Sequence, residues 1–598
     1  MSAIVAIVNA DGVRNGAVQT LQAPLSYRGA DGQSRVQLDQ VGLGCHHLFT
    51  KSLDGAAPPP VEVGGNWIAF DGRVDNRGVL VQKFGPPAEE NLTDPELVLA
   101  LYNEFGLDCL EFIEGVFALA IWDETTEELV VARDKVGIRH VYYIETGELF
   151  LVASEPRAIA ADPRVPVEPN ISLTREYVEG SIYTPEQAFY AGIKRLEPGY
   201  VVVHGSNGTT KRQYWNPITS PARERSFDSL TSELEGLLRE SVRRQLFENT
   251  PAAVSMSGGL DSTLVATLMN ELDSGPTDQS ERAFVMAFDA VDAVDERTRA
   301  NAVARENDIP LTVIDGSDIW ALQRDYTDVL DCPCRDTSYE IVDEITSEAA
   351  EFGFGRVFTG VGGNLFDGDR FIYPDLLRNG ALGAFLRHAS ADQMSLPLVC
   401  LVYGVFPFLW GKQDTIQTFR AIESGVRPTG DLADRNRVDS SQRYVDAALW
   451  YDLSDPYMDF VCDGMRRIAL RNGVELCHPL LSSRLVEFLF RIPVGGRFHR
   501  GRRKYLFRRV ARDYLPDLVC EQSVHENVYA FFRERGIDRS DTDFRSMLDG
   551  DSEVARWYST VMSDGELSVT SPEERWRAIT TARWLRSLTA CSSDPRSA

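Results

Sequence analysis

The stretch that most constrains the fold is residues 255–263, which read Ser-Met-Ser-Gly-Gly-Leu-Asp-Ser-Thr. A short apolar run, 252–254, precedes it, and an apolar run with helical character, 264–269, follows it. This order predicts a strand, a glycine turn and a helix. Because Ser257, Gly258 and Gly259 have a small side chain or none, backbone N–H groups in the turn can approach an anion closely. The helix points the positive end of its dipole at the same place, so we predict an anion site there.

Neighbouring polar residues make a phosphate the expected anion. Ser257 and Ser262 add hydroxyl donors, whereas the Asp261 carboxylate would repel a phosphate unless a cation lay between them, which makes Asp261 a candidate Mg²⁺ ligand. The Gly-Lys-[Ser/Thr] ending of a Walker loop is missing. The motif resembles instead the pyrophosphate loop of the N-type ATP pyrophosphatases, which cleave ATP to AMP and pyrophosphate. The resemblance implies ATP and Mg²⁺ at this turn, and the alternative is an ordinary glycine turn without a ligand.

The composition excludes some classes of partner. The 598 residues are 43% hydrophobic and 25% charged, which suits two or three globular domains. A formal charge of −28 argues against nucleic acid and against an anionic membrane surface as partners. Lysine occurs only seven times. Acidic, lysine-poor surfaces suit a halophilic protein, because salt screens their self-repulsion; an acidic mesophilic protein from a GC-rich genome is the alternative.

Three further features bear on the cellular location. The apolar run 396–410 is shorter than a bilayer span and is interrupted by Pro397 and Pro407, so we expect buried core or a partner surface there. The N-terminus has no basic leader and no small-residue cleavage site. The nine cysteines show no paired metal-ligand spacing. We therefore expect a cytoplasmic protein with reduced thiols and without a membrane partner.

The N-terminal third is rich in short apolar runs of the kind that form strands. One helix is expected at 94–104, with Thr93 or Asp94 as its cap and Glu96 in its first turn. Many strands with few helices predict sheet packed on sheet. The expected strands are 3–8, 41–43, 66–70, 116–122, 129–132, 141–144 and 149–153.

Four segments in this third resemble class II glutamine amidotransferase domains. Residues 27–32 are similar to their His-Arg-Gly-Pro-Asp-Gly, and residues 133–143 are similar to their Arg-Asp-x-x-Gly-x-[Lys/Arg]-Pro-Leu-Tyr-Tyr. Residues 153–155 and 192–199 match in the same order. Together with the pyrophosphate loop, these segments resemble the asparagine synthetase family over residues 1–530. The resemblance implies that residues 1–215 form an Ntn-type αββα sandwich.

The same resemblance implies that the glutaminase site is degenerate. The family's nucleophile is a cysteine exposed at the N-terminus, where this chain has Ser2, and the arginine that holds the glutamine carboxylate is His47. The Asn-Gly pair of the oxyanion site is Asp71-Gly72, and a carboxylate there opposes the developing negative charge. Asp94, which would bind the glutamine amine, matches the family. We therefore expect a scaffold that does not hydrolyse glutamine.

From about residue 225, helical segments alternate with apolar strands, as in a parallel sheet that binds ligands at the carboxyl ends of its strands. The expected helices are 230–248, 296–307 and 341–352, and the expected strands are 253–256, 283–288, 311–314 and 356–359. The resemblance implies a HUP-like α/β ATP-pyrophosphatase domain over residues 225–530. It also implies that Ser255 and Met286 contact the adenosine part of ATP.

The segment 359–368 resembles the family's Ser-Gly-Glu-Gly-Ala-Asp-Glu-Leu-Phe-Gly-Gly loop, which brings Thr359 and Gly360 to the nucleotide. Val361 and Asn364 replace its acidic residues. Asp367 or Asp369 is a candidate metal ligand in their place.

Lys504 lies in the arginine-rich segment 501–509 and matches a family lysine that contacts the phosphates of ATP and of the adenylate. There it would stabilise charge on the departing pyrophosphate. The alternative is a solvated basic helix face. Upstream, the segment 473–488 also resembles the family, although the usual Arg and Asp are Cys477 and Ser482. Residues 535–598 carry no motif, and their tryptophans predict a packed helical extension.

The resemblance implies a reaction in two steps. A substrate carboxylate attacks the α-phosphorus of ATP and gives an acyl-adenylate, and a nitrogen nucleophile then displaces AMP to form an amide. Without a glutaminase, the nitrogen comes from ammonia or from an amine on the substrate. Three hypotheses stay open: an amide ligase for a small acid, a macrolactam cyclase for a peptide that resembles lasso-peptide cyclases and β-lactam synthetases, and a non-catalytic nucleotide-binding scaffold. A homodimer is also left open.

Overall fold

The computed structural model describes the following residues: 3–49, 57–84, 92–147, 149–180, 184–218, 225–247, 250–272, 282–288, 295–316, 324, 326, 328–333, 336, 338–368, 370–392, 396–405, 407, 412, 415–416, 443–521, 556, 560 and 572–593.

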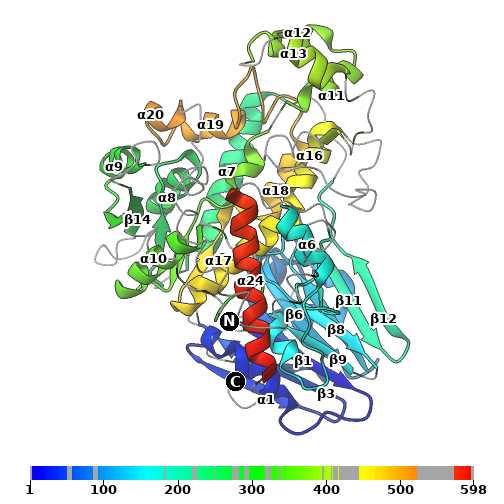
Figure 1. Ribbon diagram of the computed structural model, residues 1–598. Coiled ribbons are helices and arrows are strands. Elements are labelled where there is room, and N and C mark those ends of the chain that lie inside the picture. The colour runs from blue at the N-terminus through cyan, green and yellow to red at the C-terminus, as the bar shows by residue number, and fades with distance from the viewer. Residues whose placement is uncertain are drawn as a thin grey trace.

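Two six-stranded sheets with antiparallel pairing form the N-terminal part of the molecule (Figure 1). In spatial order, the first contains β10 (Lys194–Arg195), β8 (Tyr142–Thr146), β9 (Leu149–Ala153), β1 (Ala3–Asn9), β3 (Val41–His47) and β2 (Gly32–Gln37). The second contains β12 (Gly208–Gln213), β11 (Tyr200–Gly205), β7 (Glu128–Arg133), β6 (Gly115–Asp123), β5 (Asn66–Val74) and β4 (Val61–Val63). The strands expected from the sequence are all present.

The two sheets pack through apolar inner faces, to which Ile4, Leu43, Val131 and Phe150 contribute buried side chains. The outer face of the first sheet packs against α1 (Ala17–Gln22), α5 (Pro156–Ala160) and α6 (Ile171–Glu179). The second packs against α3 (Asp94–Phe105), which begins at a Thr93–Glu96 capping box. The expected αββα sandwich is therefore confirmed. Shorter helices here are η1 (Ala23–Arg28), α2 (Arg77–Phe84), η2 (Gly106–Asp108) and α4 (Cys109–Phe112).

The C-terminal part is built on a parallel five-stranded sheet. Its order is β15 (Leu311–Asp315), β14 (Arg282–Ala287), β13 (Ala253–Ser255), β16 (Arg356–Phe358) and β17 (Glu475–Cys477). The strands that follow β13 in the chain, β14 and β15, lie on one side of it. The later strands β16 and β17 lie on its other side. The loops after β13 and β16 therefore meet at the switch point of the sheet, where ligands bind in this kind of fold.

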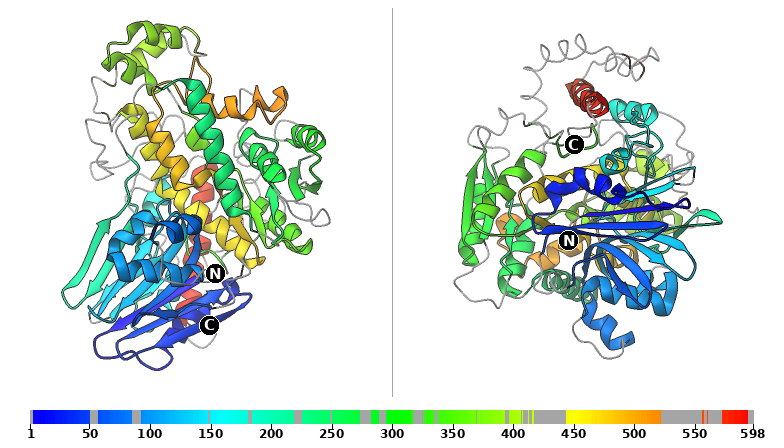
Figure 2. Two further views of the ribbon diagram at one scale, coloured as in Figure 1. Left: turned by 180° about the vertical axis from the view of Figure 1, so that it is seen from behind. Right: turned by 90° about the horizontal axis from the view of Figure 1, so that it is seen from below.

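Helices cover this sheet and continue above it in the view of Figure 1. They are α7 (Phe227–Gln245), α8 (Leu260–Leu272), α9 (Arg297–Glu306), α10 (Ser338–Glu351), η4 (Gly363–Phe366), α11 (Ile372–Arg378), α12 (Leu382–Ala389), α13 (Leu396–Val399), η5 (Cys400–Val405), α16 (Tyr444–Leu453), α17 (Pro456–Arg471), η7 (Pro479–Leu481), α18 (Ser483–Arg491), α19 (Tyr505–Ala511) and α20 (Asp517–Cys520). Figure 2 shows α17 between the parallel sheet and the N-terminal sheets.

The C-terminal helix α24 (Pro572–Ser593) returns to the N-terminal sandwich and lies along α6 (Figure 1). The Tyr177 hydroxyl lies 3.0 Å from Thr580 Oγ1, and Trp584 is buried against Phe189 and Tyr190. Most of the expected extension before residue 572 lies outside the described residues.

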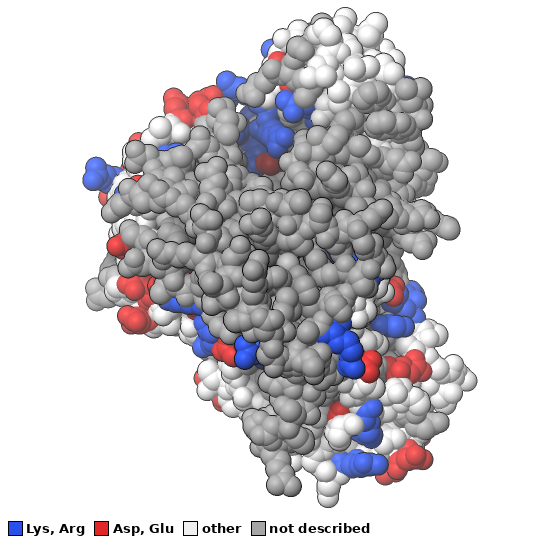
Figure 3. Space-filling view, in the orientation of Figure 1, with Lys and Arg blue, Asp and Glu red and all other residues white. Residues whose placement is uncertain are grey.

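The apolar run at 396–410 is partly core and partly surface. Val399 and Tyr403 are buried, whereas Leu398, Leu401 and Val405 are exposed. Figure 3 shows a mostly white area at the top of the molecule, where α12 and α13 lie in Figure 1, while acidic and basic side chains are interspersed over the rest of the described surface in that view. Among the described residues, no helix combines the length and apolar character needed to cross a bilayer.

Candidate active site

The turn between β13 and α8 has the geometry that its glycines predict. Gly258 adopts a φ of +76°, and a Cβ on it would lie 2.6 Å from the carbonyl oxygen of Glu296. The Ser257 and Ser262 hydroxyls lie 3.0 Å apart, and the Ser257 N–H donates to the Ser262 hydroxyl at 3.0 Å. Gly259 N–H donates to Ser257 Oγ at 3.3 Å. The turn therefore holds its hydroxyl and N–H groups together at the beginning of α8.

The loop after β16 packs directly against this turn. A Cβ on Gly360 would lie 2.6 Å from the Ser262 nitrogen, and one on Gly363 would overlap the Asp261 carboxylate. Thr359 Oγ1 lies 2.7 Å from His478 Nδ1, which fixes the beginning of the loop. The structure thus brings Thr359 and Gly360 beside the residues of the turn.

Lys504 reaches this place from the beginning of α19. Its ammonium group lies 2.5 Å from Asp261 Oδ2 and 3.3 Å from Asp367 Oδ1, and its side chain is only 3% exposed. Burial lowers the pKa of Lys504, but the carboxylates of Asp261 and Asp367 outweigh it and raise the pKa above the ordinary value. The alternative of a solvated basic face is therefore wrong for Lys504, although it fits its neighbours Arg502 and Arg503, whose side chains are about half exposed.

Asp261 and Asp367 also fit the way in which proteins hold Mg²⁺ next to phosphates, while Asp369 lies outside the described residues. Asp261 Oδ1 is buried without a hydrogen-bond partner among the described residues, so one oxygen is left for a cation. Mg²⁺ is usually bound by one or two carboxylates together with substrate phosphates. Within the described ranges, no group of three His, Cys, Asp or Glu side chains forms a site held by protein alone. The residues therefore fit an ion that arrives with ATP.

The two residues expected near adenosine lie at neighbouring strands. Ser255 ends β13 and is half-buried, whereas the Met286 side chain in β14 is buried in an apolar cluster with Phe284 and Phe288. Met286 can therefore reach a nucleotide through its backbone at the strand end more easily than through its side chain.

His47 lies in β3 and cannot replace a guanidinium group. Its side chain is buried, its Nε2 lies 2.8 Å from Ser34 Oγ, and its ring stacks on Phe49. Burial lowers the pKa of His47 to about 4. The imidazole is therefore neutral at pH 7 and offers no positive charge to a glutamine carboxylate. Ser2 lies outside the described residues.

The other residues expected at the glutamine site contact groups of the protein itself. Asp94 accepts a hydrogen bond from the Val74 N–H at 2.9 Å and lies 3.4 Å from Arg77 Nη1. Gly72 has a φ of +151°, and a Cβ on it would overlap the backbone of the neighbouring strand β6. The close approach of β6 therefore leaves no room for a side chain at position 72.

Asp71 does not lie free at an oxyanion site. It is fully buried, and Arg466 of α17 lies 2.9 Å from Asp71 Oδ2, with Arg28 and Arg139 within 3.7 Å of its carboxylate. Asp71 therefore joins the sandwich to the C-terminal part of the chain.

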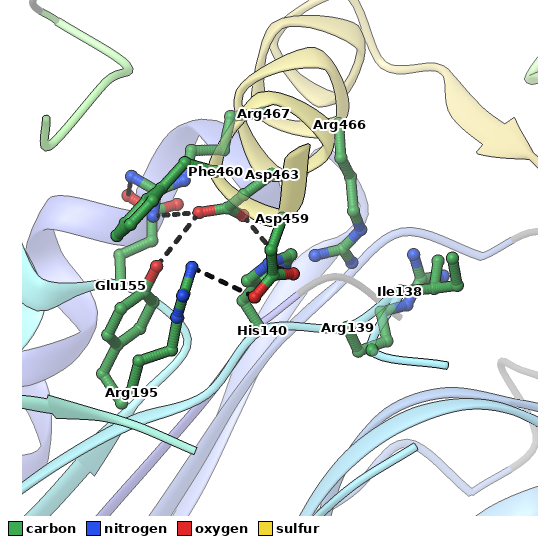
Figure 4. A network of polar contacts seen from close by, with 12 residues as sticks. Ile138, Arg139, His140, Glu155, Arg195, Asp459, Phe460, Asp463, Arg466 and Arg467 are labelled. Carbon is green, nitrogen blue, oxygen red and sulfur yellow. Dashed lines mark hydrogen bonds and ion pairs between the residues drawn. The ribbon is translucent and has the colours of Figure 1, made fainter. Parts of the chain in front are cut away.

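The contact around Asp71 is part of a larger polar network between α17 and the sandwich, which sequence reasoning missed (Figure 4). Asp459 lies 2.6 Å from Arg133, 2.7 Å from His140 and 3.0 Å from Arg195. Burial would raise the pKa of Asp459, but these three side chains hold it well below its usual range.

One turn further along α17, Asp463 lies 2.6 Å from Arg467 and accepts a hydrogen bond from the Tyr142 hydroxyl at 3.3 Å. The signal in the sequence was the placement of Asp459, Asp463 and Arg467 four residues apart, on one face of a helix.

A cavity of about 130 Å³ lies beside this network, between the two parts of the molecule. Segments 135–138 and 195–200 line it from the sandwich, and residues of 450–462 line it from α16 and α17. Its remaining wall includes Val361, Gly362, Asn364 and Leu365. Because Gly363 in the same loop contacts Asp261, the cavity lies next to the turn that follows β13.

Comparisons with known proteins match both parts of the chain. The model of a glutamine amidotransferase domain matches residues 1–215, and the model of asparagine synthase matches residues 233–531, half of the chain. Asparagine synthetase [glutamine-hydrolyzing] 3 of Bacillus subtilis is 24% identical over 531 residues, which cover 82% of this chain and 81% of that protein. Amidase chry2 of Gibberella zeae is 28% identical over 298 residues, 47% of this chain and 44% of that protein.

Among solved structures, glutamine phosphoribosylpyrophosphate amidotransferase from B. subtilis aligns over 53% of this chain and 81% of its own chain. The alignment has 14% identity and a TM-score of 0.28, which is too low to support an argument about this protein.

Proposed function

Since the chain belongs to the asparagine synthetase family and is an ATP-dependent carbon–nitrogen ligase of that family, we propose that it activates a carboxylate as an acyl-adenylate and does not hydrolyse glutamine. The observation that carries the first part is the cluster of Lys504, Asp261 and Asp367 at the glycine turn. The observation that carries the second is the burial of the His47 side chain, whose Nε2 lies 2.8 Å from Ser34 Oγ.

In the activation step, a carboxylate oxygen of the substrate bonds to the α-phosphorus of ATP, and the bond between the α-phosphorus and the bridging oxygen breaks. Pyrophosphate leaves with the electron pair. The positive end of α8 and the Ser257 and Ser262 hydroxyls would bind it. Lys504 is protonated and buried, so it neutralises charge on the leaving group in a site of low dielectric constant. Mg²⁺ held by Asp261 and Asp367 would supply further positive charge.

The acyl-adenylate is tested by following oxygen from the carboxylate. The protein is incubated with ATP, Mg²⁺, ammonium and a panel of acids, aspartate included, each labelled with heavy oxygen in the carboxylate. We expect one labelled oxygen in AMP for each turnover with an accepted acid, because that oxygen bridges carbon and phosphorus in the intermediate. Amide formation with unlabelled AMP would refute the mechanism.

The glutamine site lacks the groups that its reaction needs. His47 supplies no positive charge, Arg77 lies against Asp94, and the Asp71 carboxylate is held by arginines. We expect no glutamate release from glutamine above the rate without protein, whereas ammonium or an amine supports amide formation. Glutamate release that increases with protein concentration, in a preparation free of other glutaminases, would refute this part.

A further inference from the structure

We propose that the cavity between the two parts of the molecule binds the nitrogen nucleophile, and that this nucleophile is a primary amine with a bulky apolar body rather than ammonia. The inference rests on the ligase function proposed above and adds the class of substrate. Three observations carry it: the apolar walls of the cavity, the sign of its charged groups, and its place beside the glycine turn.

The walls of the cavity are largely aromatic and aliphatic. Trp215 and Tyr200 line it from the sandwich, Trp450 and Leu453 from α16, and Leu365 from the loop after β16. The Trp215 N–H donates to Glu487 at 2.9 Å, which holds this ring in place. Apolar walls stabilise a ligand in proportion to the apolar area that it buries. Ammonia has no such area, so these walls favour a larger ligand.

The charged groups of the lining favour a cation over an anion. Glu197, Asp452, Asp455 and Asp459 contribute four carboxylates, against the two cations Lys135 and Arg195.

Contacts within the protein engage both lining cations and also two of the four carboxylates. Glu197 lies 2.9 Å from Lys211, and Asp459 lies 2.6 Å from Arg133. The Lys135 ammonium donates to the Glu111 carbonyl at 2.8 Å, and Arg195 lies 3.0 Å from Asp459 and over the ring of Phe460. Because the lining carboxylates outnumber the lining cations, the groups that face the cavity favour an ammonium group over a carboxylate.

The cavity and the glycine turn lie on two sides of one loop. Val361, Gly362, Asn364 and Leu365 line the cavity, and Gly363 between them contacts Asp261. An amine in the cavity is thus next to the place where the acyl-adenylate would form.

In the transfer step, the bound ammonium group loses one proton to water, and the nitrogen of the resulting neutral amine bonds to the acyl carbon. The bond from that carbon to the AMP oxygen breaks, AMP leaves with the electron pair, and the second proton is lost to water. The sandwich supplies part of the cavity wall and so has a structural role without glutamine hydrolysis.

The test is calorimetric titration of the full chain, at fixed ionic strength, with 2-phenylethylamine, 3-phenylpropionate and ammonium chloride. We expect 2-phenylethylamine to bind at least about 10-fold more tightly than the carboxylate of similar size, and ammonium to show no saturable binding. Phenylalanyl-leucine amide is the arm for a peptide substrate: tighter binding than 2-phenylethylamine assigns the amine to a peptide N-terminus, and weaker binding assigns it to a small molecule. Equal binding of the amine and the carboxylate, or binding of neither, would overturn the inference.

Two variants place the binding in the cavity. Trp450→Ala removes apolar wall and is expected to weaken 2-phenylethylamine binding by about 10-fold or more, and Asp452→Asn is expected to reduce the preference for the amine over the carboxylate. Leu386→Ala, an exposed leucine on α12, is the matched control and leaves both unchanged. Wild-type affinity in both cavity variants would contradict the assignment.

Carboxylate-dependent exchange of pyrophosphate into ATP separates the two proposals. If exchange occurs but no amine binds, the inference about the cavity fails and the ligase function stands. If the amine binds but no acid of the panel supports exchange, the adenylate mechanism fails and the class of ligand stands.

Discussion

Replacing Lys504 with methionine tests the charge cluster at the glycine turn. The side chain is 3% exposed and lies 2.5 Å from Asp261 and 3.3 Å from Asp367, whose side chains are 19% and 29% exposed. Methionine keeps most of the volume and leaves the two carboxylates without this cation. Since water still reaches both, we expect a stability loss of about 1–3 kcal/mol, less than the 3–5 kcal/mol typical of breaking a fully buried pair.

The effect of Lys504→Met on the chemistry should be larger than its effect on folding. Removal of one group that stabilises developing charge costs roughly 10²–10³ in rate, or about 3–4 kcal/mol. The assay is carboxylate-dependent pyrophosphate exchange, with urea unfolding of the same preparation to measure stability. Lys194→Met, an exposed lysine in β10, is the matched control and should change neither. An exchange rate within about threefold of wild type in a folded Lys504→Met protein would refute the reasoning.

Four further outcomes follow from the structure. Gly363→Ala should abolish exchange, because its Cβ would overlap the Asp261 carboxylate. Gly355→Ala meets no atom of the described residues within 4 Å and should be silent in the same assay. Stability to urea should fall on acidification. Burial lowers the pKa of His478 to about 4 in the folded protein. As the pH falls from 6.5 towards 4, this histidine is protonated in the unfolded chain but not in the folded one, so the folded state loses stability. Burial would raise the pKa of Glu475, but nearby arginines lower it to about 2, so its contribution is complete above pH 4.5 and is lost between pH 4.5 and pH 2. A constant unfolding midpoint from pH 7 to about pH 4 would contradict the assignment for His478, and a constant midpoint from pH 4.5 to about pH 2 would contradict that for Glu475. Because salt screens the net charge of −28, the urea midpoint should rise between about 0.1 M and about 2 M KCl, and a fall would count against a halophilic protein. Ser2→Cys should not restore glutamate release, since His47 stays neutral; release from this variant would show that the nucleophile alone was missing.

The parts of the fold that follow from local patterns were predictable from the sequence. The apolar runs became strands because their alternation suits two packed faces, and the glycine turn formed because Gly258 has to adopt a positive φ next to Glu296. The helix after Thr93 began at the expected capping box.

The parts that depend on distant residues were not predictable. Asp71 was expected at an oxyanion site, but its partner Arg466 lies 395 positions further along the chain, and no local pattern joins them. The neutral state of His47 arises from burial, which its neighbours in sequence do not reveal. The approach of Gly363 to Asp261 likewise needs the order of the strands, because it arises where the loops after β13 and β16 meet.

The most direct test of the central claim is to identify the products that the protein makes from ATP. Phosphorus NMR of a reaction with Mg²⁺, ATP, 2-phenylethylamine and a panel of carboxylic acids reports where the nucleotide is cleaved. The account predicts AMP and pyrophosphate in equal amounts, formed only when an accepted acid is present. ADP and phosphate, or ATP left unchanged with every acid, would contradict it, and the second result would favour a nucleotide-binding scaffold.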